Sequence, residues 1–168
     1  MIVIDVGCAR HGTEYSVERL LRMFRPSYLL GFDPDPHVSR AMPSAAALAE
    51  LGGKTAVDLR REAAWTFDGE VGFVFNGSRG HVEEGDPRRT KVRCVDLARV
   101  IEEAPEPVVL KLDCEGNEYE LLEHLIERGA VSRLSRILIE WHKRAEPERR
   151  REIMRRVSES CPVEQWHW

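Results

Sequence analysis

The chain has 168 residues, of which 42% are hydrophobic and 32% are charged, and its formal net charge at pH 7 is −4. This length allows one sizeable hydrophobic core, so we expect a single domain over residues 1–168. The negative net charge gives no support to nucleic-acid binding. No apolar run approaches the roughly 20 residues that span a bilayer. The opening MIVIDVG lacks the basic segment of a signal peptide.

The first part of the chain alternates strand and helix patterns. A β-branched apolar run predicts a buried strand over residues 2–6. Residues 13–25 carry apolar side chains at helical spacing, with Thr13 as a suitable N-cap. A second strand is expected over residues 28–32, where it ends in the Pro-bounded turn DPDP, and an Ala-rich helix follows to about residue 51.

The middle of the chain is less regular. Residues 55–59 and 62–67 fit either a strand or a helix by propensity. Asp68-Gly69, followed by alternating apolar residues, predicts a hairpin. Residues 76–91 are rich in glycine and charge, which predicts a surface loop that would help to shape an acceptor pocket.

Regular patterns return in the last part of the chain. Asp96 is a suitable N-cap for a helix that runs to Glu103. Asn117 and Glu120 resemble a capping box, and Gly129 is expected to end the helix that they begin. The other expected elements are strands at 92–95, 108–113, 137–141 and 163–168 and a basic helix from Pro147. Strands that alternate with helices predict an α/β fold with a mostly parallel central sheet and helices on both faces.

Ligands of such folds bind beyond the carboxyl ends of the strands, and polar residues do follow the predicted strands. Gly7 and Gly12 bound the loop after the first strand, in a spacing typical neither of a dinucleotide fingerprint nor of a P-loop. Asp33 ends the second strand, where a carboxylate can accept hydrogen bonds from both hydroxyls of a ribose. Together these residues indicate an adenosine cofactor, either NAD or S-adenosylmethionine; a structural turn and a helix cap are the alternatives.

The stretch VVLKLDCEGNEY places three carboxylates, Asp113, Glu115 and Glu118, just after the strand at 108–113. Lys111 lies inside that strand and is expected to form an ion pair with one of these acids. We expect Glu118 to act in the electrostatics of the first helical turn. Glu115 has two interpretations, which are chemistry on the substrate side and capping of the following helix.

Six segments together resemble the FkbM-type family of S-adenosylmethionine-dependent methyltransferases over nearly the whole chain. They are VIDVGCARHG, GFDPDP, EAAWTFDGEVGF, VRCVDL, KLDCEGNEYELL and ILIEWH. The resemblance implies a Rossmann-like class I methyltransferase fold and S-adenosylmethionine as the cofactor. The residues that it assigns to cofactor binding are Asp5, Gly7, Cys8, Ala9, Gly12, Asp33, Pro34, Glu62, Ala63, Ala64 and Asp113.

The same resemblance implies methylation of a hydroxyl oxygen on a sugar or a small natural product. A hydroxyl must lose its proton during methyl transfer, and Asp113, Glu115 and His142 are the catalytic candidates, with Glu140 beside them. His142 could accept a proton at neutral pH, or it could fix the end of a strand. No metal is expected, although an ion held by Asp113, Glu140 and His142 is conceivable.

Several features depart from the family pattern. Cys8 replaces an alanine, Gly12 comes one residue late, and Asp33 stands where glutamate is usual. The fold is also expected to lack N-terminal elements and to be shortened at the C-terminus. Two alternatives therefore remain, a catalytically silent module that binds a cofactor or a partner, and an NAD(P)-dependent oxidoreductase.

The remaining expectations concern cellular location and self-association. The four cysteines are Cys8, Cys94, Cys114 and Cys161, and no two form a CxxC pair. This spacing argues against a zinc knuckle or a disulfide framework and predicts reduced thiols in a cytoplasmic protein. Trp166 and Trp168 would complete the edge of the core or form a contact in a homodimer.

Overall fold

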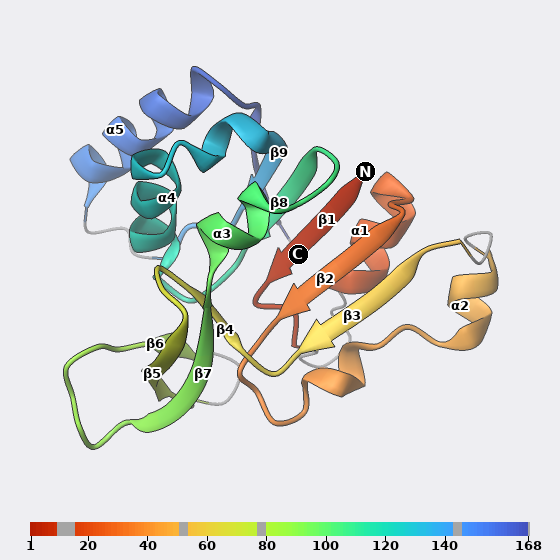
Figure 1. The fold of residues 1–168 in the computed structure, drawn as a ribbon, viewed down its shortest axis with the longest axis horizontal. Helices are drawn as coiled ribbons and strands as arrows, with labels where there is room; N and C mark the ends of the chain where they lie inside the picture. Colours follow the sequence, from red (N-terminus) through yellow and green to blue (C-terminus); the bar gives the residue numbers. More distant parts are fainter. Residues whose placement is uncertain (10–15, 51–53, 77–79, 143–145, 168) are drawn as a thin grey trace.

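The computed structural model describes the chain except for residues 10–15, 51–53, 77–79, 143–145 and 168, and it contains two sheets (Figure 1). The larger sheet has six strands in the order β10-β9-β8-β1-β2-β3, and every pairing in it is parallel. Its strands are β1 (Ile2–Val6), β2 (Tyr28–Phe32), β3 (Ala56–Arg60), β8 (Val108–Leu112), β9 (Leu134–Ile139) and β10 (Val163–Gln165).

Helices cover both faces of this sheet, because alternate side chains of each strand point to opposite sides. On one face, Ile4 and Leu110 belong to a core cluster with residues of α3 (Leu97–Glu102), α4 (Glu118–Glu127) and α5 (Pro147–Ser158). On the other, Val3 and Val109 belong to a second core cluster with residues of α1 (Ser16–Phe24). The helix α1 lies against β1 and β2 (Figure 1). Each fully buried Leu or Val side chain contributes about 1.5–3 kcal/mol, so the two layers stabilise the sheet from both sides.

The smaller sheet has the strand order β4-β7-β5-β6. β4 pairs with β7 in parallel, whereas β5 is antiparallel to both β7 and β6. The bounds of its strands are β4 (Ala63–Trp65), β5 (Gly69–Val74), β6 (His81–Val82) and β7 (Thr90–Asp96). The remaining elements are α2 (Ala45–Glu50) and the 3-10 helices η1 (Val38–Ala41) and η2 (Ala130–Arg133).

The predicted α/β fold with a parallel sheet is confirmed, and most strands of the larger sheet lie within one or two residues of their predicted positions. Asp96 is the N-cap of α3, since its carboxylate accepts hydrogen bonds from the N–H groups of Ala98 and Arg99. Gly129, with a φ of 71°, follows the end of α4 in the left-handed conformation that favours glycine. Trp166 is buried in the core beneath the guanidinium of Arg19. Thr13 and Trp168 lie outside the described residues.

Three local predictions are wrong. Asp68-Gly69 does not join a hairpin, because β7 lies between β4 and β5 and pairs with both. The expected loop at 76–91 contains β6 and the start of β7. Asn117 makes no capping hydrogen bond; its amide instead accepts from the N–H of Val82 and donates to the carbonyl of Val82, at 2.7 and 3.2 Å. These tertiary contacts outweigh the local turn and capping preferences.

Among the helices in the described ranges, none has the length and apolar character needed to cross a membrane.

Candidate active site

A cavity of about 490 Å³ lies between the carboxyl ends of the central strands and the smaller sheet. Its volume is in the range of small-molecule binding sites. Backbone hydrogen bonds continue the strand pairing past the last residues of β1, β2 and β8, so the residues after these strands meet at one edge. The cavity is lined by Val6, Gly7, Ala9, Phe32, Asp33, Pro34, Asp35, Ala63, Ala64, Phe73, Phe75, Gly80, His81, Val82, Asp113, Cys114, Glu115, Asn117, Glu140 and His142.

Gly7 allows the ends of β1 and β8 to approach each other closely. Its φ is +77°, and a Cβ atom at this position would lie 1.8 Å from the carbonyl oxygen of Asp113. Its own N–H donates to the carbonyl of Phe32 at 2.9 Å. Gly7 therefore joins three strand ends at the floor of the cavity, and a side chain there would push Asp113 away.

We expect Gly7→Ala to lower the free energy of unfolding by about 2 kcal/mol or more, from left-handed strain and from overpacking against Asp113. Urea denaturation followed by circular dichroism would measure the change. Gly129→Ala is the matched control, because Gly129 has a similar φ of +71° but, apart from its chain neighbours, no atom of the described residues lies within 4 Å of the added Cβ. In Gly129→Ala the free energy of unfolding should fall only by the cost of the left-handed conformation, about 1 kcal/mol. Equal losses in the two variants would contradict the steric role of Gly7.

Lys111 is completely buried and organises the carboxylates beneath the cavity. Its ammonium lies 3.0 Å from Oδ1 of Asp5 and 3.3 Å from Oδ2 of Asp113, and it donates to the carbonyl of Gly7 at 2.8 Å. Burial disfavours its charge, but the two carboxylates outweigh burial and hold the pKa of Lys111 above its usual value. The expected ion pair of Lys111 is therefore confirmed, and it fixes Asp113 in place.

Asp5 lies behind the cavity and has no exposed surface. The hydroxyl of Ser16 donates to its Oδ2 at 2.6 Å, and Lys111 approaches its Oδ1. Burial raises the pKa of Asp5, and the two partners oppose this effect. A carboxylate placed in this way supports the first loop from beneath and has no contact with the cavity itself.

Asp33 holds the loop after β1 against the end of β2. Its Oδ2 accepts the N–H of Ala9 and its Oδ1 accepts the N–H of Asp35, each at 2.9 Å. Burial raises the pKa of Asp33, whereas these two hydrogen bonds act in the opposite direction. Each carboxylate oxygen can accept a further hydrogen bond, and the side chain lines the cavity. The carboxylate of Asp33 therefore keeps capacity to accept further hydrogen bonds at the wall of the cavity.

Glu118 stabilises the turn between β8 and α4. It is fully buried, and its Oε1 accepts the N–H groups of Cys114 and Gly116, both at 3.1 Å. Glu115 has a backbone φ of +55° within this turn, a conformation that residues other than glycine rarely adopt. Glu118 thus holds a strained turn that presents the carboxylates of Asp113 and Glu115.

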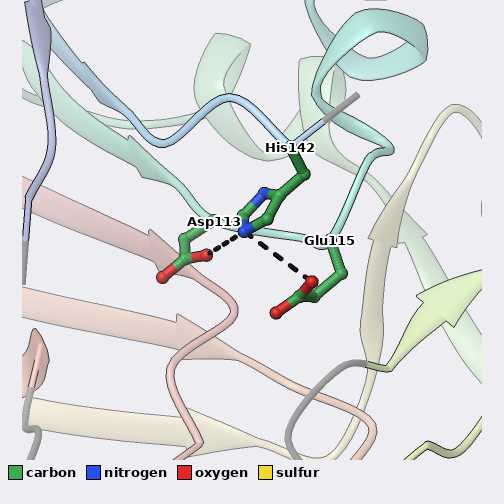
Figure 2. Close-up of side chains that lie close together, drawn as sticks. All are labelled: Asp113, Glu115 and His142. Carbon is green, nitrogen blue, oxygen red and sulfur yellow. Dashed lines mark ion pairs between the residues drawn. The ribbon is translucent and has the colours of Figure 1, made fainter. Parts of the chain in front are cut away.

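His142 lies among four carboxylates. Its Nδ1 is 2.8 Å from Oε1 of Glu118, and its Nε2 faces Asp113 and Glu115 (Figure 2). Glu140 is the fourth, 3.7 Å from Nε2. Burial opposes the charge of the imidazole, but the bond to Glu118 and the neighbouring acids prevail and raise the pKa of His142 to about 9. The same bond holds the pKa of Glu118 below its usual value, against the effect of burial. His142 is therefore mainly protonated at neutral pH.

The sequence profile of the methyltransferase FkbM domain matches residues 5–161. The chain belongs to the FkbM methyltransferase family. No curated protein and no solved structure matches it significantly. The matched range contains every residue that lines the cavity, so the cavity belongs to the methyltransferase domain.

The fold brings most of the predicted site residues to the cavity of this FkbM domain. Those that line it are Gly7, Ala9, Asp33, Pro34, Ala63, Ala64, Asp113, Glu115 and His142. Asp5, Cys8 and Glu62 do not line it. Cys8 is buried, and the Glu62 carboxylate pairs with Arg93 at 3.1 Å. Gly12 lies outside the described residues.

Sequence reasoning placed the segment 76–91 near an acceptor pocket but identified none of the individual residues that close the cavity of the FkbM domain. This wall consists of Phe73, Phe75, His81 and Val82, and the side-chain amide of Asn117 joins it through two hydrogen bonds to Val82. The role of Glu118 was also missed, since the bond to His142 joins residues 24 positions apart. The only available signal was the presence of Glu118 in the KLDCEGNEY stretch.

Proposed function

We propose that this domain is a class I, S-adenosylmethionine-dependent methyltransferase that methylates a hydroxyl oxygen of a sugar or another small molecule. The observation that carries the proposal is the orientation of Asp33. Two backbone N–H groups hold its carboxylate at the wall of a cavity that opens beyond the parallel strands. A carboxylate in this position suits the two hydroxyls of an adenosine ribose.

The proposed positions of the cofactor follow from the cavity walls. Asp33 would bind the ribose, and the small side chains of Ala63 and Ala64 would leave room for the adenine ring. Gly7 and Asp113 follow the central strands β1 and β8, where the methionine part would bind. Asp5 and Lys111 would position this part of the cavity indirectly, through their ion pair beneath the loop. When bound, the cofactor supplies an electrophilic methyl group.

The side chains near Asp113 would orient the acceptor and take its proton. Methyl transfer is an in-line displacement, so the hydroxyl must be held in line with the bond that breaks. A protonated His142 cannot accept a proton, whereas the side chains of Asp113 and Glu115 both line the cavity. We propose these two acids as the groups that receive the hydroxyl proton, with His142 as their cationic neighbour.

Isothermal titration with S-adenosylhomocysteine, NAD and NADP tests the cofactor. We expect S-adenosylhomocysteine to bind and the two nicotinamide dinucleotides to give no heat of binding, since the first loop lacks the dinucleotide fingerprint. Binding of NAD or NADP without S-adenosylhomocysteine would instead indicate an oxidoreductase. Binding of S-adenosylhomocysteine without methyl transfer from S-adenosylmethionine to any of a panel of sugars and small alcohols would favour the silent binding module.

A further inference from the structure

The imidazole of His142 lies among carboxylates in the part of the cavity that follows β9, three strands away from β2 and Asp33 in the larger sheet. Oδ1 of Asp113 lies 3.5 Å from its Nε2, and Oε2 of Glu115 lies 3.7 Å from the same atom (Figure 2). Both distances exceed the 2.7–3.2 Å that is usual for a hydrogen bond between nitrogen and oxygen. The three side chains point toward a common space from different parts of the chain.

The separations match those of ligands around one ion. Two ligand atoms bound at about 2.1 Å, with octahedral or tetrahedral angles, are roughly 3.0–3.4 Å apart. The observed distances of 3.5 and 3.7 Å from Nε2 are only a few tenths of an ångström longer. One atom from each of Asp113, Glu115 and His142 can be chosen so that all lie within 4.8 Å of one another. Side-chain movements that bring the three ligand atoms closer together would complete the coordination.

The other ring nitrogen of His142, Nδ1, contacts a carboxylate, which is an arrangement common among histidines that bind metals. This nitrogen pairs at 2.8 Å with Oε1 of Glu118, which is fully buried and is itself anchored by two backbone N–H groups. Metal-bound histidines commonly donate their other ring N–H to a carboxylate, which directs the remaining nitrogen toward the ion. Here that nitrogen, Nε2, is directed toward Asp113 and Glu115.

The charge around this space also favours a cation. Glu140 approaches the same nitrogen at 3.7 Å and lines the cavity. The Oε2 atom of Glu118 is buried and has no hydrogen-bond partner among the described residues. A buried carboxylate oxygen without a donor is costly unless positive charge lies near. Carboxylate clustering of this kind is compensated when a divalent ion binds.

We propose that Asp113, Glu115 and His142 bind a divalent cation of the Mn²⁺ type. Two carboxylates and one imidazole combine the ligands that suit Mn²⁺ with one that also suits Zn²⁺ and Fe²⁺. The ion's role rests on the proposed function: it would bind the acceptor oxygen and lower the pKa of the hydroxyl. Binding of the ion would displace the proton from Nε2 of His142, so that Asp113 and Glu115 would serve as ligands and water, in place of these two acids, would receive the hydroxyl proton. The oxygen would form a bond to the methyl carbon, and the carbon–sulfur bond would break with its electron pair on sulfur.

Uptake of Mn²⁺ can be measured directly by electron paramagnetic resonance, because the signal of the free aqueous ion decreases on binding. We expect the protein to bind Mn²⁺ more tightly than about 1 mM, which is the weak end for specific carboxylate sites. Glu115→Gln and His142→Gln should each weaken binding at least about 10-fold, and Glu118→Gln should do so through the orientation of His142. Glu127→Gln is the control, since Glu127 is an exposed carboxylate of α4 and should leave binding unchanged.

Thermal unfolding shows whether each variant is folded, and S-adenosylhomocysteine titrations on the same proteins separate the two proposals. No Mn²⁺ uptake by the wild-type chain, or equal uptake by folded Glu115→Gln, would overturn the metal site. In either case, continued binding of S-adenosylhomocysteine would leave the proposed function standing. Binding of Mn²⁺ that depends on Glu115, without binding of S-adenosylhomocysteine, would support the metal site and count against the proposed function.

Discussion

Replacing Asp33 by alanine should weaken the binding of S-adenosylhomocysteine about 100-fold or more. Asp33 is the proposed acceptor of two ribose hydroxyls, and each hydrogen bond to a charged group contributes about 1.5–3 kcal/mol. The substitution also removes the acceptor for the N–H groups of Ala9 and Asp35, which lie 2.9 Å from its two oxygens. The loop would then lose its shape as well as its ligand contact.

Isothermal titration measures this loss, and Asp58→Asn provides the control. Asp58 is an acid on the neighbouring parallel strand β3, but its carboxylate pairs with Tyr28 and Arg60 and does not line the cavity. Its replacement should leave the affinity for S-adenosylhomocysteine unchanged. If Asp33→Ala is folded and binds as tightly as the wild-type chain, Asp33 does not hold the ribose.

Lys111→Met should lower the free energy of unfolding by roughly 3–5 kcal/mol, the usual cost of removing one partner from a buried ion pair. The substitution leaves Asp5 without its cation at a site that has no exposed surface. It also frees Asp113, the neighbouring carboxylate at 3.3 Å, at the floor of the cavity. Urea denaturation followed by tryptophan fluorescence would measure the change.

The double variant Asp5→Asn/Lys111→Met separates lost charge compensation from lost packing. It removes both members of the buried pair, and neutral replacements of buried pairs are often far less destabilising than half-broken pairs. We expect it to be more stable than Lys111→Met. A double variant that is less stable than Lys111→Met would show that packing, and not an uncompensated carboxylate, causes the loss.

The part of the cavity that we propose for the cofactor was predictable because it depends on strand ends. Gly7, Asp33 and Asp113 each follow a buried strand, and parallel strands place such residues along one edge. The part that we propose for the acceptor was not predictable in the same way. The sequence indicated His142 as a catalytic candidate and Glu118 as a charge in the first helical turn, but it did not predict that they are in contact. This contact, which raises the pKa of His142, forms only because β9 lies beside β8.

The sequence by itself determined the parallel α/β architecture, the family and the pairing of Lys111 with a carboxylate, because apolar runs, helical periodicity and a charge inside a buried strand are local signals. Only the tertiary structure decided the insertion of β7 between β4 and β5 and the contact of Asn117 with Val82. These features join residues that are far apart in the chain; Asn117 and Val82 are separated by 35 positions. Contacts between residues so far apart in the chain depend on how whole strands and helices pack against one another, and a local sequence pattern carries no information on that packing.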